Sequence, residues 1–97
     1  MKIEWSLFAV EDRTRIFEYI EQDDPLAAVA VDERIMEQTA TLPAFPECGR
    51  PGRVEGTREL VINHTSFIVA YRVQDGIVRI LCILHGAQFW PKELEDK

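Results

Sequence analysis

The first half of the chain carries apolar side chains at helical spacing. Between residues 7 and 22 they recur at spacings close to a helical turn, which predicts an amphipathic helix, and Ser6 is placed to cap its first turn. The predicted apolar stripe comprises Leu7, Val10, Ile16, Phe17 and Ile20. Asp12 falls largely off this stripe and is expected on the solvent side. Pro25 disfavours helical backbone at the residue before it, so the helix should end near Gln22.

A second helix is predicted after a short connection. Asp24 can cap it, and Pro25 fits its first helical position, where the N–H that proline lacks would have no partner anyway. Its apolar stripe comprises Ala28, Val31, Ile35 and Leu42, with Met36 beside it. Two amphipathic helices joined so closely form a hairpin, and this hairpin needs an apolar surface to pack on.

The second half of the chain alternates between apolar and polar side chains, as strands do. The strand-like runs cover residues 57–63, 66–74 and 77–85, and another covers residues 2–5 before the first helix. Asp75-Gly76 is a strong signal for a two-residue hairpin turn. The predicted fold class is therefore α+β, in the order β-α-α-β-β-β, with the helical hairpin packed on one face of a mainly antiparallel sheet.

The hairpin turn also predicts which side chains face each other. A turn at residues 75–76 pairs residue 74 with residue 77, so Arg72 stands opposite Arg79 on one face. Two like charges in that position repel unless solvent screens them or an anion or carboxylate lies between them. One face of the last run is expected to carry Val78, Ile80, Cys82 and Leu84. Its other face is also largely apolar, which is typical of a strand covered on two sides.

Residues 43–56 separate the helices from the strands and are expected to lack regular structure. This segment contains three prolines and three glycines, and it carries Arg50 and Arg53. Long structured loops in compact domains are often functional. The loop and the sheet face away from the helices are therefore the first candidates for a binding surface.

A chain of 97 residues is expected to form one domain, residues 1–97, around a single modest core. No apolar run approaches the roughly 20 residues that span a bilayer, and no signal peptide is visible, so we expect a cytoplasmic protein with no membrane partner. Cys82 lies in an apolar run and is expected to be buried, whereas Cys48 is expected to be an exposed thiol. Neither the cysteines nor His64 and His85 show metal-site spacing, so no metal and no cofactor are expected.

The charge is unevenly distributed along the chain. Residues 1–49 hold eleven acids and four bases, whereas residues 50–97 hold six acids and seven bases, within a net charge of -6. The arginines of the second half are concentrated around the strands. Such asymmetry is typical of a dipolar molecule whose functional face meets an anionic or acidic partner, and also of helices that are simply solvated by acidic residues.

Three segments carry a resemblance to a known family. They are GRVEGTRELV at residues 52–61, IVAYRV at residues 68–73 and ILCILHGAQ at residues 80–88. Together with the element order, they closely resemble the RelE/ParE toxin superfamily. Its members are the toxins of bacterial type II toxin–antitoxin modules, also known as addiction modules or plasmid-stabilisation proteins. The resemblance covers nearly the whole chain.

The resemblance implies two different activities, and the residues of this chain help to distinguish between them. RelE-like members are ribosome-dependent mRNA endonucleases whose cations stabilise the charge that develops on the phosphate. An ungapped match puts Glu59 and Val61 at two lysine positions of that site, and Ile68 and Gln88 at two arginine positions. No tyrosine follows Trp90, although such members carry one near the C-terminus. A carboxylate in place of a lysine would repel the phosphate, so the usual nuclease is disfavoured.

ParE-like members lack this basic set and, as a family, poison DNA gyrase without being enzymes. The resemblance therefore favours a non-enzymatic ParE-like toxin that inhibits DNA gyrase. The target-facing cations expected for it are Arg50, Arg53, Arg58, Arg72 and Arg79. One alternative is a RelE-like nuclease that acts on the ribosome with an atypical site of Arg58, Arg72, His85 and Gln88. The other alternative is an inactive toxin homologue that only binds its antitoxin and represses their operon.

The resemblance also implies a cognate antitoxin that wraps the toxin and forms a hetero-oligomer with it. Antitoxins of this kind place a helix in an apolar groove and can add a strand to a sheet edge. The candidate contacts are the apolar residues left on the helical hairpin and the edge of the predicted sheet. Phe89 and Trp90, which are hard to bury next to Pro91, are further candidate antitoxin contacts, although Trp90 could equally fold back onto the core.

Overall fold

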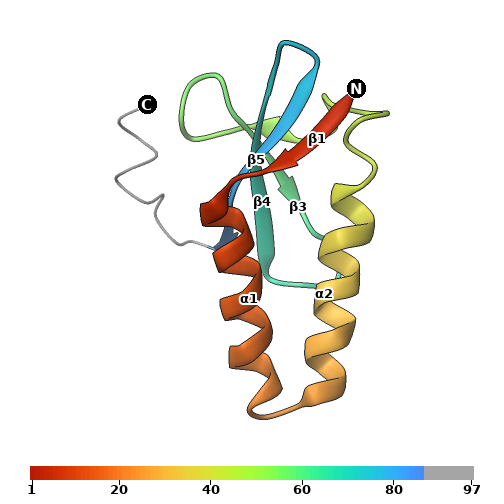
Figure 1. The fold of residues 1–97 in the computed structure, drawn as a ribbon, viewed down its shortest axis with the longest axis vertical. Helices are drawn as coiled ribbons and strands as arrows, with labels where there is room; N and C mark the ends of the chain where they lie inside the picture. The colour runs from red at the N-terminus through yellow and green to blue at the C-terminus, as the bar shows by residue number, and fades with distance from the viewer. Residues whose placement is uncertain (87–97) are drawn as a thin grey trace.

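The computed structural model describes residues 1–86, and its helices form the predicted hairpin (Figure 1). Strand β1 (Lys2–Trp5) is followed by helix α1 (Leu7–Glu21) and helix α2 (Pro25–Thr39). Both predicted caps are confirmed: the Ser6 hydroxyl accepts a hydrogen bond from the Ala9 N–H, and the Asp24 carboxylate accepts one from the Ala27 N–H. These bonds satisfy donors that a helix start otherwise leaves without partners.

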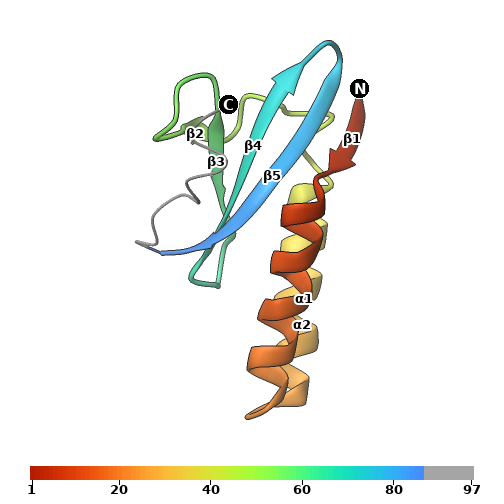
Figure 2. The same ribbon diagram turned by 60° about the vertical axis from the view of Figure 1, so that its left-hand side comes forward.

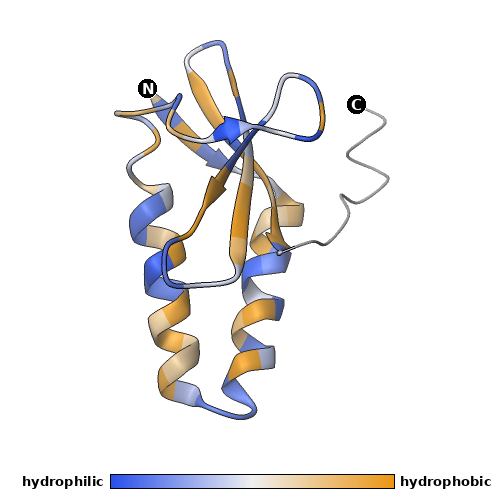
Figure 3. Cartoon of the chain, turned by 180° about the vertical axis from the view of Figure 1, so that it is seen from behind, coloured by the Kyte–Doolittle hydropathy of each residue, from blue (hydrophilic) through white to orange (hydrophobic). Residues whose placement is uncertain are grey.

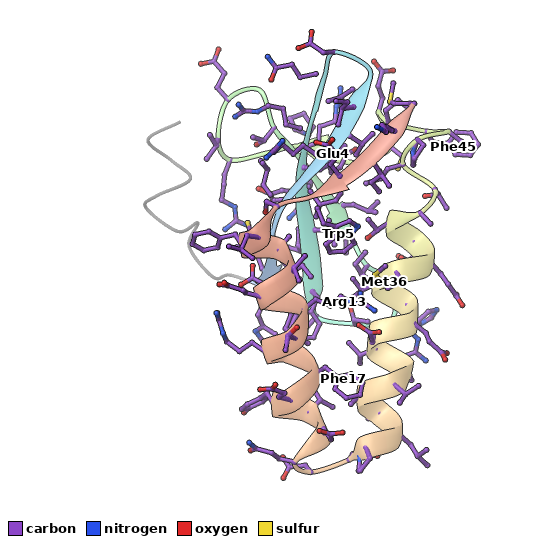
Figure 4. All side chains as sticks on the ribbon, viewed as in Figure 1. Glu4, Trp5, Arg13, Phe17, Met36 and Phe45 are labelled. Carbon is purple, nitrogen blue, oxygen red and sulfur yellow. The ribbon has the colours of Figure 1, made fainter. Side chains whose placement is uncertain are left out.

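A charged pair and an aromatic side chain join the two helices. The Arg13 guanidinium donates two hydrogen bonds, of 2.7 and 2.9 Å, to the carboxylate of Asp32 on α2. Figure 4 shows that Arg13 and Phe17 both point from α1 into the space between the helices. The pKa of Arg13 is raised, chiefly by this hydrogen bond to Asp32.

The remaining strands complete a five-stranded sheet. They are β2 (Arg50–Pro51), β3 (Arg58–Val61), β4 (Phe67–Gln74) and β5 (Ile77–His85), and the strand order is β1-β5-β4-β3-β2. β1 runs parallel to β5, and the other neighbours are antiparallel. The predicted fold class is confirmed. The prediction that residues 43–56 lack regular structure was wrong at β2, where two residues pair with β3 because Glu59 holds this part of the loop (described below).

The helices cover one face of the sheet, which we call the helix-side face (Figure 2). The core between them comprises Ala9, Ile35, Leu42, Ile62, Val69, Tyr71, Val78, Ile80 and Ile83. The predicted stripe of α1 was wrong at its start, because Leu7 and Val10 are 74% and 46% exposed. Ala9 and Ile16 face the sheet instead, and Asp12 lies on the same side, where its carboxylate accepts a hydrogen bond from the Ile83 N–H.

A β-bulge at Leu81 changes the face of every later side chain in β5. Ala70 pairs with Cys82 but Tyr71 pairs with Ile80, so Leu81 is an extra residue. The prediction that the apolar alternation continues through the strand was therefore wrong. Val78 and Ile80 lie on the helix-side face, whereas Cys82 and Leu84 lie on the opposite face, which we call the outer face.

Tyr71 fixes the long loop to the core. Its hydroxyl donates to the Pro46 carbonyl at 2.8 Å and accepts from the Gly49 N–H at 2.9 Å, and the side chain is fully buried. A Cβ atom at Gly49 would lie 2.6 Å from the Tyr71 hydroxyl, so only glycine fits there. Burial raises the pKa of Tyr71, so the hydroxyl remains protonated as a donor.

Replacing Tyr71 with Phe tests this attachment. Tyr71→Phe should lower the free energy of unfolding by about 1–3 kcal/mol, because the buried Gly49 N–H loses its acceptor. Urea denaturation followed by circular dichroism measures it. Tyr19→Phe is the matched control, since Tyr19 is 73% exposed, and it should change stability by less than about 0.5 kcal/mol. Equal stability of the two variants would show that the hydroxyl does not hold the loop.

Candidate functional site

The outer face of the sheet carries most of the candidate cations. The strand register puts Glu4, Arg79, Arg72, Ala70, Glu59 and Arg50 on this face, in order from β1 to β2. Figure 3 views the molecule from behind, with the outer face of the sheet toward the reader and polar colour in the connection between β3 and β4. Both charged and apolar groups therefore share one surface.

Glu59 is a buried carboxylate that holds two of the predicted target-binding arginines. It is only 3% exposed, and it accepts hydrogen bonds from the Arg53 backbone N–H and the Arg53 Nε, both at 3.0 Å. The Arg50 guanidinium donates to the same carboxylate at 3.3 Å. A buried carboxylate needs such partners, because an isolated charge is costly to remove from water. Arg50 and Arg53 therefore stabilise the loop by binding Glu59, in addition to lying on its surface.

Arg58 lies away from these residues. It pairs with Tyr71 and so belongs to the helix-side face. Its Nη1 donates to the Gly49 carbonyl at 2.8 Å and to the Glu47 carbonyl at 3.3 Å. In this structure Arg58 ties residues 47–49 to β3, and the structure does not bring it together with the outer-face arginines.

Arg72 and Arg79 stand opposite each other, as the hairpin turn predicted. A carboxylate does lie beside them, because Glu4 of β1 accepts a hydrogen bond of 3.3 Å from Arg79. Figure 4 labels Glu4 on β1, the strand that runs parallel to β5. Arg72 is different, since its buried Nε has no hydrogen-bond partner.

The opposite end of the outer face is apolar. It is formed by Ile68, Ala70, Cys82 and Leu84, with Val54 and Leu81 packed against them. Burial, together with the negative charges of Asp12 and Glu59, raises the pKa of the Cys82 thiol to about 12. A neutral buried thiol is a poor nucleophile, so Cys82 acts here as a small apolar side chain. The second cysteine, Cys48, is exposed, as predicted.

The residues proposed for an atypical nuclease do not converge. His85 pairs with Phe67 on the helix-side face, at the far end of β5 from the turn. Its Nε2 lies 2.9 Å from the Ser66 hydroxyl, and its ring packs edge-on against Phe67. Arg72 lies on the outer face. Within the part of the chain that the structure describes, no single substrate phosphate could meet both side chains.

A groove of about 630 Å³ lies between α1 and the last residues of β5. Its lining comprises Asp12, Arg15, Ile16, Tyr19, Ile20, Val31, Thr65, Ser66, Phe67, Ile83 and His85. The groove exists because β1 ends at Trp5, opposite Ile80, so the following residues of β5 pair with β4 on one side but with no strand of residues 1–86 on the other. Its floor is apolar, and its lining also carries the charged side chains of Asp12 and Arg15 and the polar ones of Thr65, Ser66 and His85.

The cap residue of α1 and a side chain within α1 occupy the edge of β5 that β1 leaves uncovered. The Ser6 hydroxyl donates to the Leu81 carbonyl at 2.8 Å, and the Asp12 carboxylate accepts from the Ile83 N–H at 3.0 Å. Burial raises the pKa of Asp12, although the hydrogen bond from Ile83 and the charge of Arg15 oppose this effect. A capped edge is protected against uncontrolled strand pairing.

Comparison with known proteins identifies the family. A family model described as the ParE toxin of the type II toxin–antitoxin system parDE matches residues 3–90. The chain belongs to this ParE toxin family. It is 42% identical over 93 residues to a Sinorhizobium fredii protein named toxin Y4kP, with 96% of both chains covered. It is 36% identical over 87 residues to a protein named toxin RelE2 from Caulobacter vibrioides, covering 90% of this chain and 97% of that one.

A solved structure agrees with the family assignment. The chromosomal ParDE toxin–antitoxin system from P. aeruginosa contains a chain with a TM-score of 0.82 and 28% sequence identity, covering 89% of this chain and 96% of that one. The ParE-family fold thus accounts for the helical hairpin and the sheet. In the described residues of this family member, neither helix has the length and apolar character needed to cross a membrane.

The structure places the positions that the resemblance matched to nuclease cations. Glu59, Val61 and Ile68 share the outer face, because Glu59 pairs with Ala70 and Val61 pairs with Ile68. None of the three is cationic. The fourth matched position, Gln88, and the candidate antitoxin contacts Phe89 and Trp90 lie outside the described residues.

The structural roles of three residues were missed from the sequence: Glu4, Asp12 and Tyr71. The parallel pairing of β1 with β5 places Glu4 beside Arg79, and no local sequence pattern predicts that pairing. Asp12 was assigned to the solvent because its contact is with a residue 71 positions away. Tyr71 was recognised only as part of an alternating strand, since its hydroxyl partners lie in an irregular loop.

Glu59→Gln tests the loop attachment. It should lower the free energy of unfolding by about 2 kcal/mol, because Gln loses the charge that two arginines share and puts an amide N–H against their donors. Trypsin should also cut faster between Arg53 and Val54. Glu55→Gln, exposed in the same loop, is the control. Unchanged cleavage in Glu59→Gln would contradict the proposed attachment.

Asp12→Asn tests the carboxylate at the edge of β5. A carboxyl pKa raised in the folded state contributes stability that is present below the unfolded value of 3.8 and is lost as pH rises through the folded pKa. The unfolding free energy of the parent minus that of Asp12→Asn should therefore fall as pH rises from 3.8 toward neutrality. Denaturation at a series of pH values measures it, and a rising difference would contradict the shift.

Asp12→Ala separates charge from hydrogen bonding at this position. Asn keeps an acceptor for the Ile83 N–H, whereas Ala leaves that donor bare. Asp12→Ala should therefore be less stable than Asp12→Asn at every pH at which both are folded.

Proposed function

We propose that this ParE-family chain is a non-enzymatic toxin that inhibits DNA gyrase and is neutralised by a cognate antitoxin. The observation that carries the proposal is the chemistry of the outer face at Glu59, Val61 and Ile68. A nuclease of the RelE kind needs cations there to stabilise charge on a phosphate. This chain has instead a buried carboxylate, a valine and a nearly buried isoleucine.

The electrostatics of the face favour a protein target over direct binding to nucleic acid. Glu59 neutralises much of the charge of Arg50 and Arg53, and Glu4 does the same for Arg79. Phosphate contacts dominate the affinity of nucleic-acid-binding proteins. A chain with a net charge of -6, in which carboxylates pair with Arg50, Arg53 and Arg79, is poorly suited to them.

A supercoiling assay with purified gyrase tests the target. The toxin at micromolar concentration should block supercoiling and trap gyrase on cleaved DNA, and an equimolar amount of the antitoxin should restore activity. No inhibition together with no cleaved complex would contradict the gyrase target. Codon-phased cleavage of mRNA on ribosomes, abolished by His85→Ala, would establish the nuclease alternative. Induction in cells without a growth defect would indicate the inactive homologue.

We place the antitoxin in the groove between α1 and β5. Its apolar floor suits the apolar side of an amphipathic helix, which is one common way in which a groove binds a peptide. Addition of a strand at Ile83 is disfavoured, because Asp12 already occupies that N–H. Phe89 and Trp90 remain proposed contacts, since they follow His85 of the groove by only a few residues, a span of roughly 16 Å at full extension.

Tyr19→Asp tests the groove. Tyr19 lines it and is 73% exposed, so the substitution should leave folding intact while weakening antitoxin binding by at least about tenfold. Leu26→Asp is the matched control, because Leu26 is 83% exposed and lies outside the groove lining. Isothermal titration calorimetry measures both affinities. Equal losses in the two variants would place the antitoxin elsewhere or show only a general charge effect.

A further inference from the structure

The arginines of the second half of the chain differ in the groups that their guanidinium nitrogens contact. The Glu59 carboxylate binds Arg50 and Arg53, loop carbonyls bind Arg58, and the Glu4 carboxylate binds Arg79. Arg72 has no hydrogen bond or ion pair to any of residues 1–86. It is also half-buried, and its Nε is fully buried. A partly desolvated cation without a counter-charge is costly, which identifies Arg72 as an incomplete site.

The position of Arg72 suits it to receive an anion. Its side chain lies directly opposite Arg79 on the outer face, so two guanidinium groups face the same region of solvent. Burial of the Nε restricts the plane of the Arg72 guanidinium. A group that is already held in position loses less conformational entropy when a ligand binds.

We propose that Arg72 and Arg79 form a receptor for a carboxylate side chain, Asp or Glu, of the toxin's protein target. Because the Nε of Arg72 is buried, Arg72 offers a fork of its two terminal nitrogens, and Arg79 supplies a second charge. Planar guanidinium groups bind carboxylates through two parallel hydrogen bonds, which fixes geometry as well as adding energy. The identity of the partner rests on the function proposed above, whereas the existence of the receptor does not.

A single carboxylate fits this site better than a nucleic-acid backbone. Glu4 lies next to Arg79, and it would repel the second and third phosphates of a strand that followed the sheet surface. The two arginines also match one compact anion, because residues opposite each other on neighbouring strands have Cα atoms only about 5 Å apart.

The receptor is separate from the proposed antitoxin groove. Arg72 and Arg79 lie on the outer face, near the turn between β4 and β5. The groove lies on the helix-side face, and its lining includes Ser66 and His85 at the other end of the same two strands. Substitutions in the receptor should therefore leave antitoxin affinity unchanged.

Nuclear magnetic resonance on the full chain tests the receptor directly. The Nε–Hε signal of Arg72 should shift in a saturable way when a blocked peptide of alternating Glu and Gly is added. Arg79→Gln should weaken peptide binding by about tenfold. Arg72→Lys keeps the charge but loses the planar fork, so it should bind the peptide no better than Arg79→Gln.

Two controls make the measurement specific. Glu4→Gln should tighten peptide binding, because it removes the carboxylate that competes for Arg79. Arg34→Gln changes an exposed arginine on α2 and should have no effect. No saturable shift, or an equal loss in Arg34→Gln, would overturn the receptor. A larger shift with an oligothymidylate of equal charge would show that the site binds phosphates, and would overturn the choice of a protein carboxylate.

Gyrase inhibition by Arg72→Lys and Arg79→Gln separates this proposal from the one before it. If the parent toxin does not inhibit gyrase but the peptide binds, the gyrase target is wrong and the receptor stands. If the parent and both variants inhibit gyrase equally, the gyrase target stands and the role of the receptor is wrong. Only the two proposals together predict inhibition by the parent and an increase of about tenfold in the concentration that the variants require.

Discussion

Along the edge of β5 that faces away from β4, the neighbouring element changes from strand β1 to helix α1. The arrangement of the molecule depends on this change. β1 pairs with β5 only as far as Ile80, and the Ser6 hydroxyl then takes the Leu81 carbonyl. The same hydroxyl accepts the first N–H bond of α1. One side chain thus ends the strand, starts the helix and fixes the helix against the sheet. Asp12, about 1.7 helical turns after Ser6, makes a second hydrogen bond to the same edge, at the Ile83 N–H.

This change of partner explains both the bulge and the groove. The extra residue at Leu81 turns its carbonyl toward Ser6 and moves Cys82 and Leu84 to the outer face. Because no strand in the described part of the chain follows β1 along this edge, a groove lies beside Ile83 and His85. Its lining carries the paired charges of Asp12 and Arg15, and the burial of Asp12 is tolerated because its carboxylate completes a backbone hydrogen bond.

Local patterns were enough to predict the elements and two of the pairings. Helix caps at Ser6 and Asp24 act within a few residues, and the Asp75-Gly76 turn sets the register that brings Arg72 to Arg79. Predictions failed where a distant partner decided the outcome. Leu7 and Val10 are apolar yet exposed, because attachment through Ser6 and Asp12 turns α1 so that Ala9 and Ile16 face the sheet.

The candidate site shows the same division between local and distant causes. Sequence alone could indicate that Arg50 and Arg53 lie in one loop, but not that Glu59 folds beneath them as a buried partner. A glutamate at a position matched to a nuclease lysine predicted repulsion of phosphate. The structure adds that this glutamate is needed to hold the loop, so returning it to lysine would place three cations together and release β2.

The two faces of the sheet also constrain how neutralisation can work. If the antitoxin occupies the groove and the target's carboxylate binds Arg72 and Arg79, the two partners contact opposite faces and opposite ends of the β4–β5 hairpin. A short helix in the groove would then leave the arginine pair open. Neutralisation requires either an antitoxin segment long enough to pass from one face to the other, or enough bulk at the groove to keep the target away from the molecule. The length of the bound antitoxin segment distinguishes these two mechanisms.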